Sequence, residues 1–170
     1  MHPAAVDEKK LLEACEVRRQ RRSGPGGQHR NKVETAVVIV HEPTGVKAEA
    51  NERRSQEENR QQAIFRLRVN LALAVRQTCE LAGYIPSGTW QARRRDGKLS
   101  INPTHADFPS MLAEALDVLA ATDMDAKQAA ELLGCSTSQF VKFLQHEPEA
   151  IQQVNAHRRA ASKPPYLPRN

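Results

Sequence analysis

The residues best suited to chemistry in this sequence are two adjacent glycines and a glutamine, Gly26-Gly27-Gln28, in the run from Gly24 to His29. Residues without a Cβ let the backbone approach a substrate closely and adopt angles closed to other residues. The glutamine adds an uncharged amide that donates and accepts hydrogen bonds. No Ser, Cys or His nucleophile stands with a base beside it here, so covalent acyl transfer has little support. The motif favours a loop that presents its backbone and a neutral amide to a substrate, and a plain flexible turn is the alternative.

The elements on either side of this loop must hold it in place. Before it, a short helical segment from Asp7 to Cys15 is followed by Glu16 to Arg18, which are expected to open a strand. After it, the β-branched run 35–40, a turn at 42–45 and the alternating segment 46–50 predict a β-hairpin.

A long helix is predicted after the hairpin. Ser55, followed by Glu58, forms a capping box that opens this helix, which is expected to run to about Leu81 and to end at Gly83. Apolar residues spaced for one buried face recur along it: Ile64, Leu67, Leu71 and Val75. The first domain, residues 1–83, is therefore expected to be α+β, with a small β-sheet packed by one long helix and the glycine loop projecting from it.

The remainder of the chain is predicted to be mostly helical. Residues 84–106 form a basic connector, in which 95–98 make a tight turn between short strands and Trp90 is the large apolar anchor. Residues 107–161 form a small all-α region, and residues 162–170 an extended, weakly ordered, Pro-rich basic tail. Helices are expected from Asp107 as N-cap, over 126–133, from Ser136 or Thr137, and over 150–161.

The distribution of charge indicates a polyanionic partner. The formal net charge is +5, and residues 1–100 hold 19 Lys and Arg against 12 Asp and Glu. Two runs, 18–22 and 93–95, place arginines side by side at a cost that a phosphate backbone would relieve. The alternative is that these runs are solvated surface.

Composition argues against several other classes of protein. No apolar run approaches the roughly 18 residues of a membrane span, and no secretory segment is evident, so a cytoplasmic protein is expected. The three cysteines form no CxxC pair and have no His cluster near them, which argues against a disulfide framework and a zinc site. No metal and no organic cofactor are expected.

Further residues extend the glycine motif into a resemblance to a known family. They are Asn31-Lys32, Ala36-Val37, His41 with Pro43-Thr44-Gly45, Arg54-Ser55-Gln56 and Asn59-Arg60. With residues 23–29 they resemble, in order and spacing over about residues 14–75, the catalytic domain of bacterial class I peptide chain release factors. The resemblance implies hydrolysis of the peptidyl-tRNA ester by a loop that enters the peptidyl transferase centre of the large ribosomal subunit.

The resemblance also implies roles for individual residues. Gly26, Gly27 and Gln28 would be catalytic: the Gln28 backbone N–H would donate to the developing oxyanion, and its side chain would position or select the attacking water. The ribosome and tRNA would supply the rest of the active site, and N5-methylation of Gln28 is suggested. Loop support, or contact with ribosomal RNA or tRNA, is predicted for Arg21, Arg22, Ser23, His29, Arg30, Asn31, Lys32, Arg54, Ser55 and Gln56.

The sequence departs from the family's pattern in two places. Arg30 stands where the family usually has a small apolar residue, so that this position either faces RNA or reflects different packing of the loop. Only about 22 residues precede Ser23, so a codon-reading domain is not expected. We therefore expect a monomeric, shortened factor that rescues stalled ribosomes or separated large subunits without reading a codon. Cations that could serve as a basic tail are few: His157, Arg158, Arg159, Lys163 and Arg169.

Residues 126–143 are similar to a helix-turn-helix, with Ala130 at the tight helix contact, Gly134 at the turn, and Phe140 and Phe143 on the inner face. The outward residues of the second helix are Ser138, Gln139, Lys142 and Gln145. They include no Arg that could read guanine. A helical packing unit that docks on ribosomal RNA or protein is at least as well supported, so we assign no base-reading role.

Two alternatives to a rescue hydrolase remain open. One is a ribosome-binding or rRNA-binding factor without turnover, which Arg30 and the atypical C-terminal helices would fit. The other is a helix-turn-helix DNA-binding protein, which ranks last because it leaves the glycine motif unexplained.

Overall fold

The computed structural model describes residues 1–20, 36–95 and 98–167; residues 21–35, 96–97 and 168–170 lie outside this description. The chain divides into two compact units, Met1–Val75 and Arg76–Asn170. The first combines a sheet with helices and the second is mostly helical, which confirms the predicted α+β class. The finer division predicted at residues 83, 106 and 161 stays a prediction.

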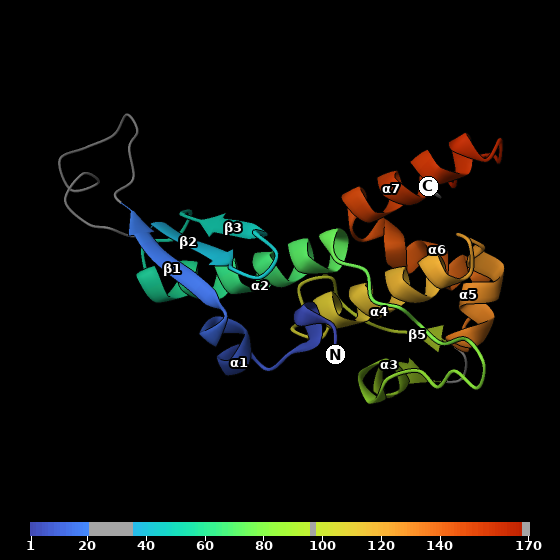
Figure 1. Cartoon of the computed structure of the whole chain (residues 1–170), viewed down its shortest axis with the longest axis horizontal. Coiled ribbons are helices and arrows are strands. Elements are labelled where there is room, and N and C mark those ends of the chain that lie inside the picture. Colours follow the sequence, from blue (N-terminus) through green and yellow to red (C-terminus); the bar gives the residue numbers. More distant parts are fainter. Residues whose placement is uncertain (21–35, 96–97, 168–170) are drawn as a thin grey trace. The chain divides into compact units, whose positions relative to one another are not determined.

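The first unit is built on three antiparallel strands in the order β1-β2-β3 (Figure 1). Their bounds are β1 Cys15–Gln20, β2 Ala36–His41 and β3 Lys47–Ala50. Gly45, at φ +69°, makes the turn between β2 and β3, where its N–H donates to the carbonyl of His41 at 2.8 Å. That φ lies in the left-handed region, which suits glycine. Both the strand expected from Glu16 and the hairpin are confirmed.

Helix α2, Gln56–Ala74, packs on β2 and β3 and supplies the core of this unit. The Ser55 hydroxyl caps it by accepting a hydrogen bond from the Glu58 N–H at 3.3 Å, as the capping box predicts. Its buried face meets the inward side of the sheet, which includes Val37 and Ile39. The residues of that face include Ala63, Ile64, Leu67 and Leu71.

The predicted end of this helix near Leu81 and Gly83 is wrong. Val75, at ψ 140°, is the extended C-cap of α2. Two residues later the Gln77 N–H donates to the carboxylate of Asp117 at 3.0 Å, in place of a helical carbonyl. A side-chain acceptor therefore takes a backbone donor that the helix would have needed.

Two short elements at the N-terminus pack beside the sheet and α2. They are the 3₁₀ helix η1, Pro3–Ala5, and helix α1, Glu8–Glu13, capped by the Asp7 carboxylate. Arg68 of α2 donates to the Ala4 carbonyl at 2.9 Å, which ties η1 to the long helix. Helix α1 leads directly into β1 and confirms the helical segment predicted there.

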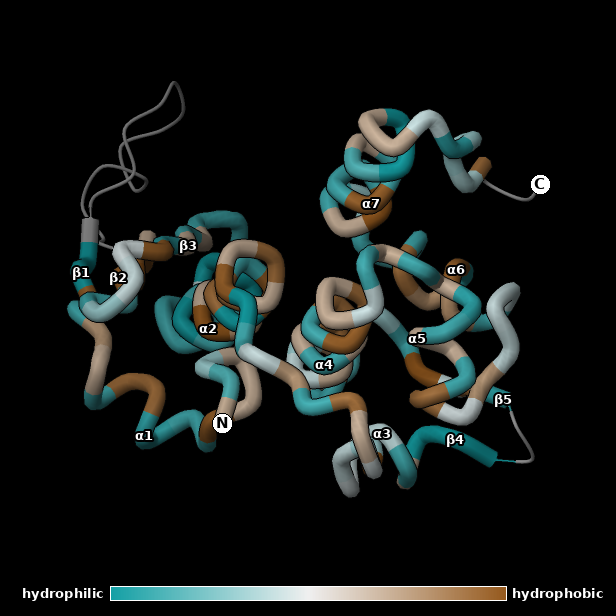
Figure 2. Tube along the Cα trace, turned by 45° about the vertical axis from the view of Figure 1, so that its right-hand side comes forward, coloured by the Kyte–Doolittle hydropathy of each residue, from teal (hydrophilic) through white to brown (hydrophobic). Residues whose placement is uncertain are grey.

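The second unit contains the remaining elements. They are α3 Gly88–Arg93, β4 Arg94–Arg95, β5 Lys98–Leu99, α4 Phe108–Ala121, α5 Ala126–Leu132, α6 Thr137–Gln145 and α7 Pro148–Ala160. Strands β4 and β5 pair antiparallel, as the predicted turn requires. Figure 2 shows apolar residues recurring along α4, whereas β4 is hydrophilic.

Aromatic side chains hold the core of the second unit. Trp90 is fully buried, and its indole N–H donates to the Leu133 carbonyl at 2.9 Å. The Trp90 and Phe143 rings meet edge to face at 5.4 Å, and Phe108 lies 5.4 Å from Phe143. Because Phe143 comes from α6 and Trp90 from α3, these contacts join the connector to the helical region.

Helices α5 and α6 confirm the predicted helix-turn-helix arrangement. Gly134 makes the turn at φ +68°, and Ala130 and Phe140 are buried at the contact between the helices. The positive φ at Gly134 suits glycine, and a Cβ added there would meet the guanidinium end of Arg94, which would have to move.

Two predicted features of this unit differ in the structure. Asp107 precedes α4, but its side chain makes no capping bond, because Arg93 binds its carboxylate at 2.6 and 2.8 Å. Residues 163–167 are extended but anchored: Asn155 bonds both the N–H and the carbonyl of Tyr166, at 2.7 and 3.0 Å. The expectation of a weakly ordered tail is therefore wrong for this stretch.

Candidate functional site

Most of the predicted site residues lie outside the described part of the chain. These are Arg21, Arg22, Ser23, Gly26, Gly27, Gln28, His29, Arg30, Asn31 and Lys32. Their predicted roles stay predictions. The structure defines the elements on which they are mounted.

The strand register places both ends of segment 21–35 together. Gln20, the last residue of β1, pairs with Ala36, the first residue of β2. Ala36 and Val37 are 3% and 2% exposed, so the return point of the segment is fixed in the core. The segment with the Gly-Gly-Gln motif therefore leaves and rejoins the sheet at one end, which we call the loop end.

The remaining predicted site residues lie at the loop end as well. Val37 pairs with Ala50, the last residue of β3, so the chain that follows β3 starts beside the base of the segment (Figure 1). Arg54 and Ser55 in this stretch are exposed, and Gln56 begins α2. The structure thus brings residues 54–56 to the base of the predicted catalytic loop from a distance in sequence.

A buried asparagine, to which sequence analysis assigns no role, fixes this stretch. Asn59 is fully buried in the first turns of α2. Its side-chain oxygen accepts from the Arg53 N–H at 2.9 Å, and its side-chain nitrogen donates to the Arg53 carbonyl at 3.0 Å. A buried polar side chain that bonds both the N–H and the carbonyl of one residue holds that backbone firmly. An Asn one turn after a helix cap was the available signal.

One salt bridge and one hydrogen bond, both made by Arg66, fix this end further. Arg66 of α2 binds the Glu52 carboxylate and donates to the Glu49 carbonyl at 2.8 Å. The hydrogen bond from Arg66 lowers the pKa of Glu52 to about 2. Glu52 is therefore ionised at neutral pH and already paired.

The cysteines and His41, which could act as nucleophiles or metal ligands, lie in surroundings that do not activate them. Burial raises the pKa of Cys135 to about 11 and also raises that of Cys15 and Cys79, so none is activated as a thiolate. His41 is buried at the far end of β2, where its Nδ1 lies 2.8 Å from the Thr44 hydroxyl, and burial lowers its pKa. Within the described residues, no three His, Cys, Asp or Glu side chains gather as a metal site would require.

Comparison with known proteins identifies the family. The model of the RF-1 domain matches residues 8–93, half of the chain, and this range contains the Gly-Gly-Gln segment, the sheet and α2. The chain belongs to the RF-1 domain family. The match continues through α3, beyond the first compact unit.

Two similar relatives carry the same printed name, peptide chain release factor 1. The one from Frankia casuarinae is 32% identical over 129 residues, which cover 65% of this chain and 36% of the relative. The one from Streptococcus thermophilus is 52% identical over 50 residues, which cover 29% of this chain and 14% of the relative. The matches thus span only about a third, or less, of the length of these relatives.

In the second unit of this RF-1 domain protein, the arginine run 93–95 does not form the phosphate-binding cluster suggested by its sequence. Arg93 is bound to Asp107, and Arg94 donates to the carbonyls of Leu133 and Gly134 at 3.4 and 3.1 Å. Arg95 alone of the three is exposed. The run mainly satisfies acceptors within its own unit.

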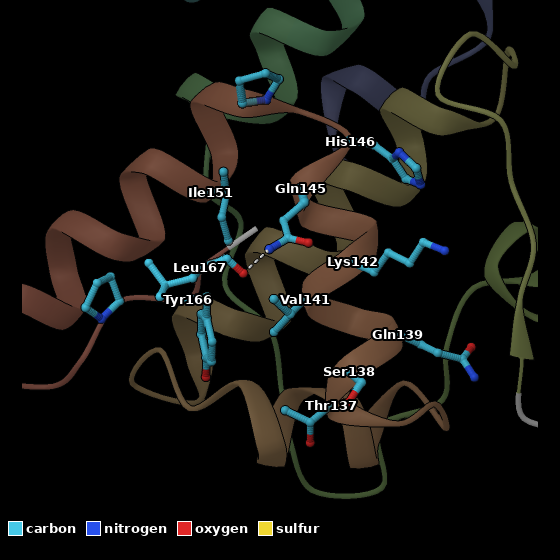
Figure 3. Close-up of a pocket in the computed structure, with 12 residues that line it drawn as sticks. Thr137, Ser138, Gln139, Val141, Lys142, Gln145, His146, Ile151, Tyr166 and Leu167 are labelled. Atoms are coloured by element: carbon cyan, nitrogen blue, oxygen red, sulfur yellow. Dashed lines mark hydrogen bonds between the residues drawn. The ribbon is translucent and has the colours of Figure 1, made fainter. Parts of the chain in front are cut away.

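Side chains on the outward face of the helix-turn-helix also form hydrogen bonds within the chain. The Gln139 side-chain oxygen accepts from the Leu99 N–H at 2.5 Å, and Gln145 donates to the Leu167 carbonyl at 3.0 Å. Figure 3 shows the groove beside α6, in which Tyr166 and Leu167 lie opposite Val141. Two of the four predicted outward side chains are therefore engaged by the chain itself, which gives base reading no support.

Every helix among the described residues is too short or too polar to span a membrane.

Proposed function

We propose that this chain hydrolyses the peptidyl-tRNA ester on the ribosome, with Gly26-Gly27-Gln28 as the catalytic element. One observation carries the proposal: the RF-1 domain match covers residues 8–93, which include this motif. Two similar relatives named peptide chain release factor 1 support it. The shared loop end of β1, β2 and the stretch after β3 supports it further, since a loop that enters another molecule needs a rigid base.

The chemistry follows from the residue types. The Gln28 backbone N–H donates to the oxyanion that forms when water attacks the ester carbon, and the side-chain amide helps to orient that water. Gly26 and Gly27 let the backbone come close enough to do so. Ribosome and tRNA complete the site, and the half-buried, unactivated thiols of the described residues take no part.

We propose further that release is independent of a codon and takes place on stalled ribosomes or separated large subunits. The test is single-turnover release from ribosomes that hold peptidyl-tRNA on a messenger truncated in the P site, repeated with a stop codon in the A site. Release should occur on the truncated complex, and Gln28→Pro should lower its rate roughly 10²–10³-fold by deleting the N–H. Gly27→Ala should impair release less, by restricting the loop.

A second candidate is a ribosome-binding factor without turnover, favoured by Arg30 in the glycine segment. Undiminished ribosome binding with no release from either complex would support this candidate. Normal release by Gln28→Pro would contradict the proposed mechanism.

A further inference from the structure

Three exposed arginines gather at the loop end of the first unit. Arg19 pairs with Val37, which in turn pairs with Ala50, so Arg19 lies at the same end as the chain that follows β3. That chain supplies Arg53 and Arg54, both exposed. The three come from two separate stretches of sequence on either side of the predicted catalytic loop.

Several of the carboxylates near these arginines are bound by other side chains. Glu16 is bound by Arg18 at 2.6 Å and Glu52 by Arg66. Glu57 takes hydrogen bonds from Arg60 and Gln61 at 3.4 and 3.0 Å. Among the described residues, Arg19, Arg53 and Arg54 form no salt bridge, and two nearby acids, Glu49 and Glu58, form none either. Three arginines thus stand against two acids. The loop end therefore carries uncompensated positive charge.

Part of this charge is preorganised. Asn59 holds the backbone of Arg53 from both sides, so the stretch that carries Arg53 and Arg54 is ordered before any partner arrives. Ordering in advance lowers the entropic cost of binding.

We propose that Arg19, Arg53 and Arg54 form a phosphate-binding surface for ribosomal RNA beside the catalytic loop, with Asn59 as its positioning residue. The proposal depends on the proposed function only for the identity of the RNA. The arginine guanidinium matches phosphate oxygens in a bidentate fork. Exposed apolar anchors, which a protein partner would use, are scarce here: Val17 is the large exposed hydrophobic residue of the described strands.

Binding of the full chain to purified large ribosomal subunits, measured over a series of salt concentrations, tests the surface. Arg19→Gln with Arg53→Gln should lower the magnitude of the slope of log K against log salt by about 2, one for each phosphate that is no longer bound. The matched control removes the same charge at the opposite end of the sheet, with Lys10→Gln and Lys47→Gln, both exposed. Equal changes in slope for the two pairs, or none for the arginine pair, would overturn the proposal.

The role of Asn59 has its own matched control on the same helix. Asn70, which is also on α2, donates to the Lys47 carbonyl at 2.8 Å, at the end of β3 away from Arg53. Asn59→Ala should weaken subunit binding several-fold in a chain whose folding is verified by circular dichroism, and Asn70→Ala should not. The effect of Asn59→Ala should vanish once Arg53 and Arg54 are both replaced by Gln, because the clamp acts through them. Persistence of the effect in that background would make Asn59 merely structural.

Failure of this proposal is distinguishable from failure of the proposed function. All binding measurements are repeated in the Gln28→Pro chain, in which release is expected to be strongly slowed. A wild-type chain that binds with the predicted slopes but releases no peptide would retain the surface and refute the hydrolase. A chain that releases peptide, but whose salt slope is unchanged by the Arg19→Gln and Arg53→Gln pair, would support the hydrolase and refute the surface.

Discussion

Arginines in the two units of this molecule have opposite uses, although adjacent arginines occur in both. In the second unit, Arg93 and Arg94 are drawn inward to a carboxylate and to helix-terminal carbonyls. In the first unit, Arg53 and Arg54 form no salt bridge among the described residues, and Arg66 binds the carboxylate of the neighbouring Glu52. The difference teaches that a basic run indicates a polyanion only where the fold leaves its charge unmatched.

The largest predicted effect is a loss of stability in the second unit that leaves ribosome binding by the first unit unchanged. Trp90→Ala removes a fully buried ring and its hydrogen bond, and should lower the free energy of unfolding of the second unit by about 3–5 kcal/mol. Thermal unfolding followed by near-UV circular dichroism measures this change. The salt slope of ribosome binding should be unchanged if the first unit carries the contacts. A smaller salt slope of ribosome binding in Trp90→Ala would show that the second unit also carries phosphate contacts, and would contradict the contrast between the two units.

The next effect concerns how Arg94 fits its unit. Gly134→Ala places a Cβ against the Arg94 guanidinium at a φ of +68°, whereas Gly83→Ala meets a similar φ of +69° in open space. Chemical denaturation should show a decrease of about 1–2 kcal/mol for Gly83→Ala from the backbone alone, and a larger decrease for Gly134→Ala. Equal decreases would mean that Arg94 moves away at no cost and is not held by its carbonyl partners.

Sequence patterns predicted the elements of this chain better than they predicted the partners of its side chains. The hairpin, the Ser55 cap and the helix-turn-helix follow from local signals, and the structure has all three. The end of α2 was missed because Asp117, forty residues away, binds the Gln77 N–H. No local pattern encodes such a contact.

The same limit applies to the candidate site. The spacing of Gly26-Gly27-Gln28 and of residues 54–56 indicated the family, and the RF-1 domain match agrees. The convergence of the second set on the loop end required the strand register, which pairs Gln20 with Ala36 and Val37 with Ala50. The function of Asn59 depends on two hydrogen bonds to a residue six positions earlier, which composition and periodicity do not reveal.

Two smaller effects, one on unfolding free energy and one on ribosome binding, should distinguish the arginines of the two units. Arg93→Gln breaks the half-buried pair with Asp107 and should cost about 1 kcal/mol of unfolding free energy with no change in ribosome binding. Arg54→Gln should leave the unfolding free energy unchanged and weaken ribosome binding, with the salt slope reduced by about 1. Denaturant titration and salt-dependent binding, run on both variants, give four values. A loss of unfolding free energy in Arg54→Gln would show that Arg54 has a structural role, as Arg93 and Arg94 have.

The smallest effect is one of pH, and it tests why Arg53 and Arg54 remain unmatched. The Glu52 pKa is lowered from 4.5 to about 2 by the hydrogen bond from Arg66, so the folded state favours the ionised carboxylate more than the unfolded state does. This contribution to stability is complete above pH 4.5 and disappears as the pH falls from 4.5 towards 2. Because both side chains are nearly half exposed, solvent screening should limit it to a few tenths of a kcal/mol. Denaturation of the wild type and Glu52→Gln at about pH 7 and about pH 3 should show the difference between them shrinking at the lower pH. A difference that stays constant would mean that Arg66 does not hold the Glu52 carboxylate, which would then be free to neutralise Arg53 or Arg54.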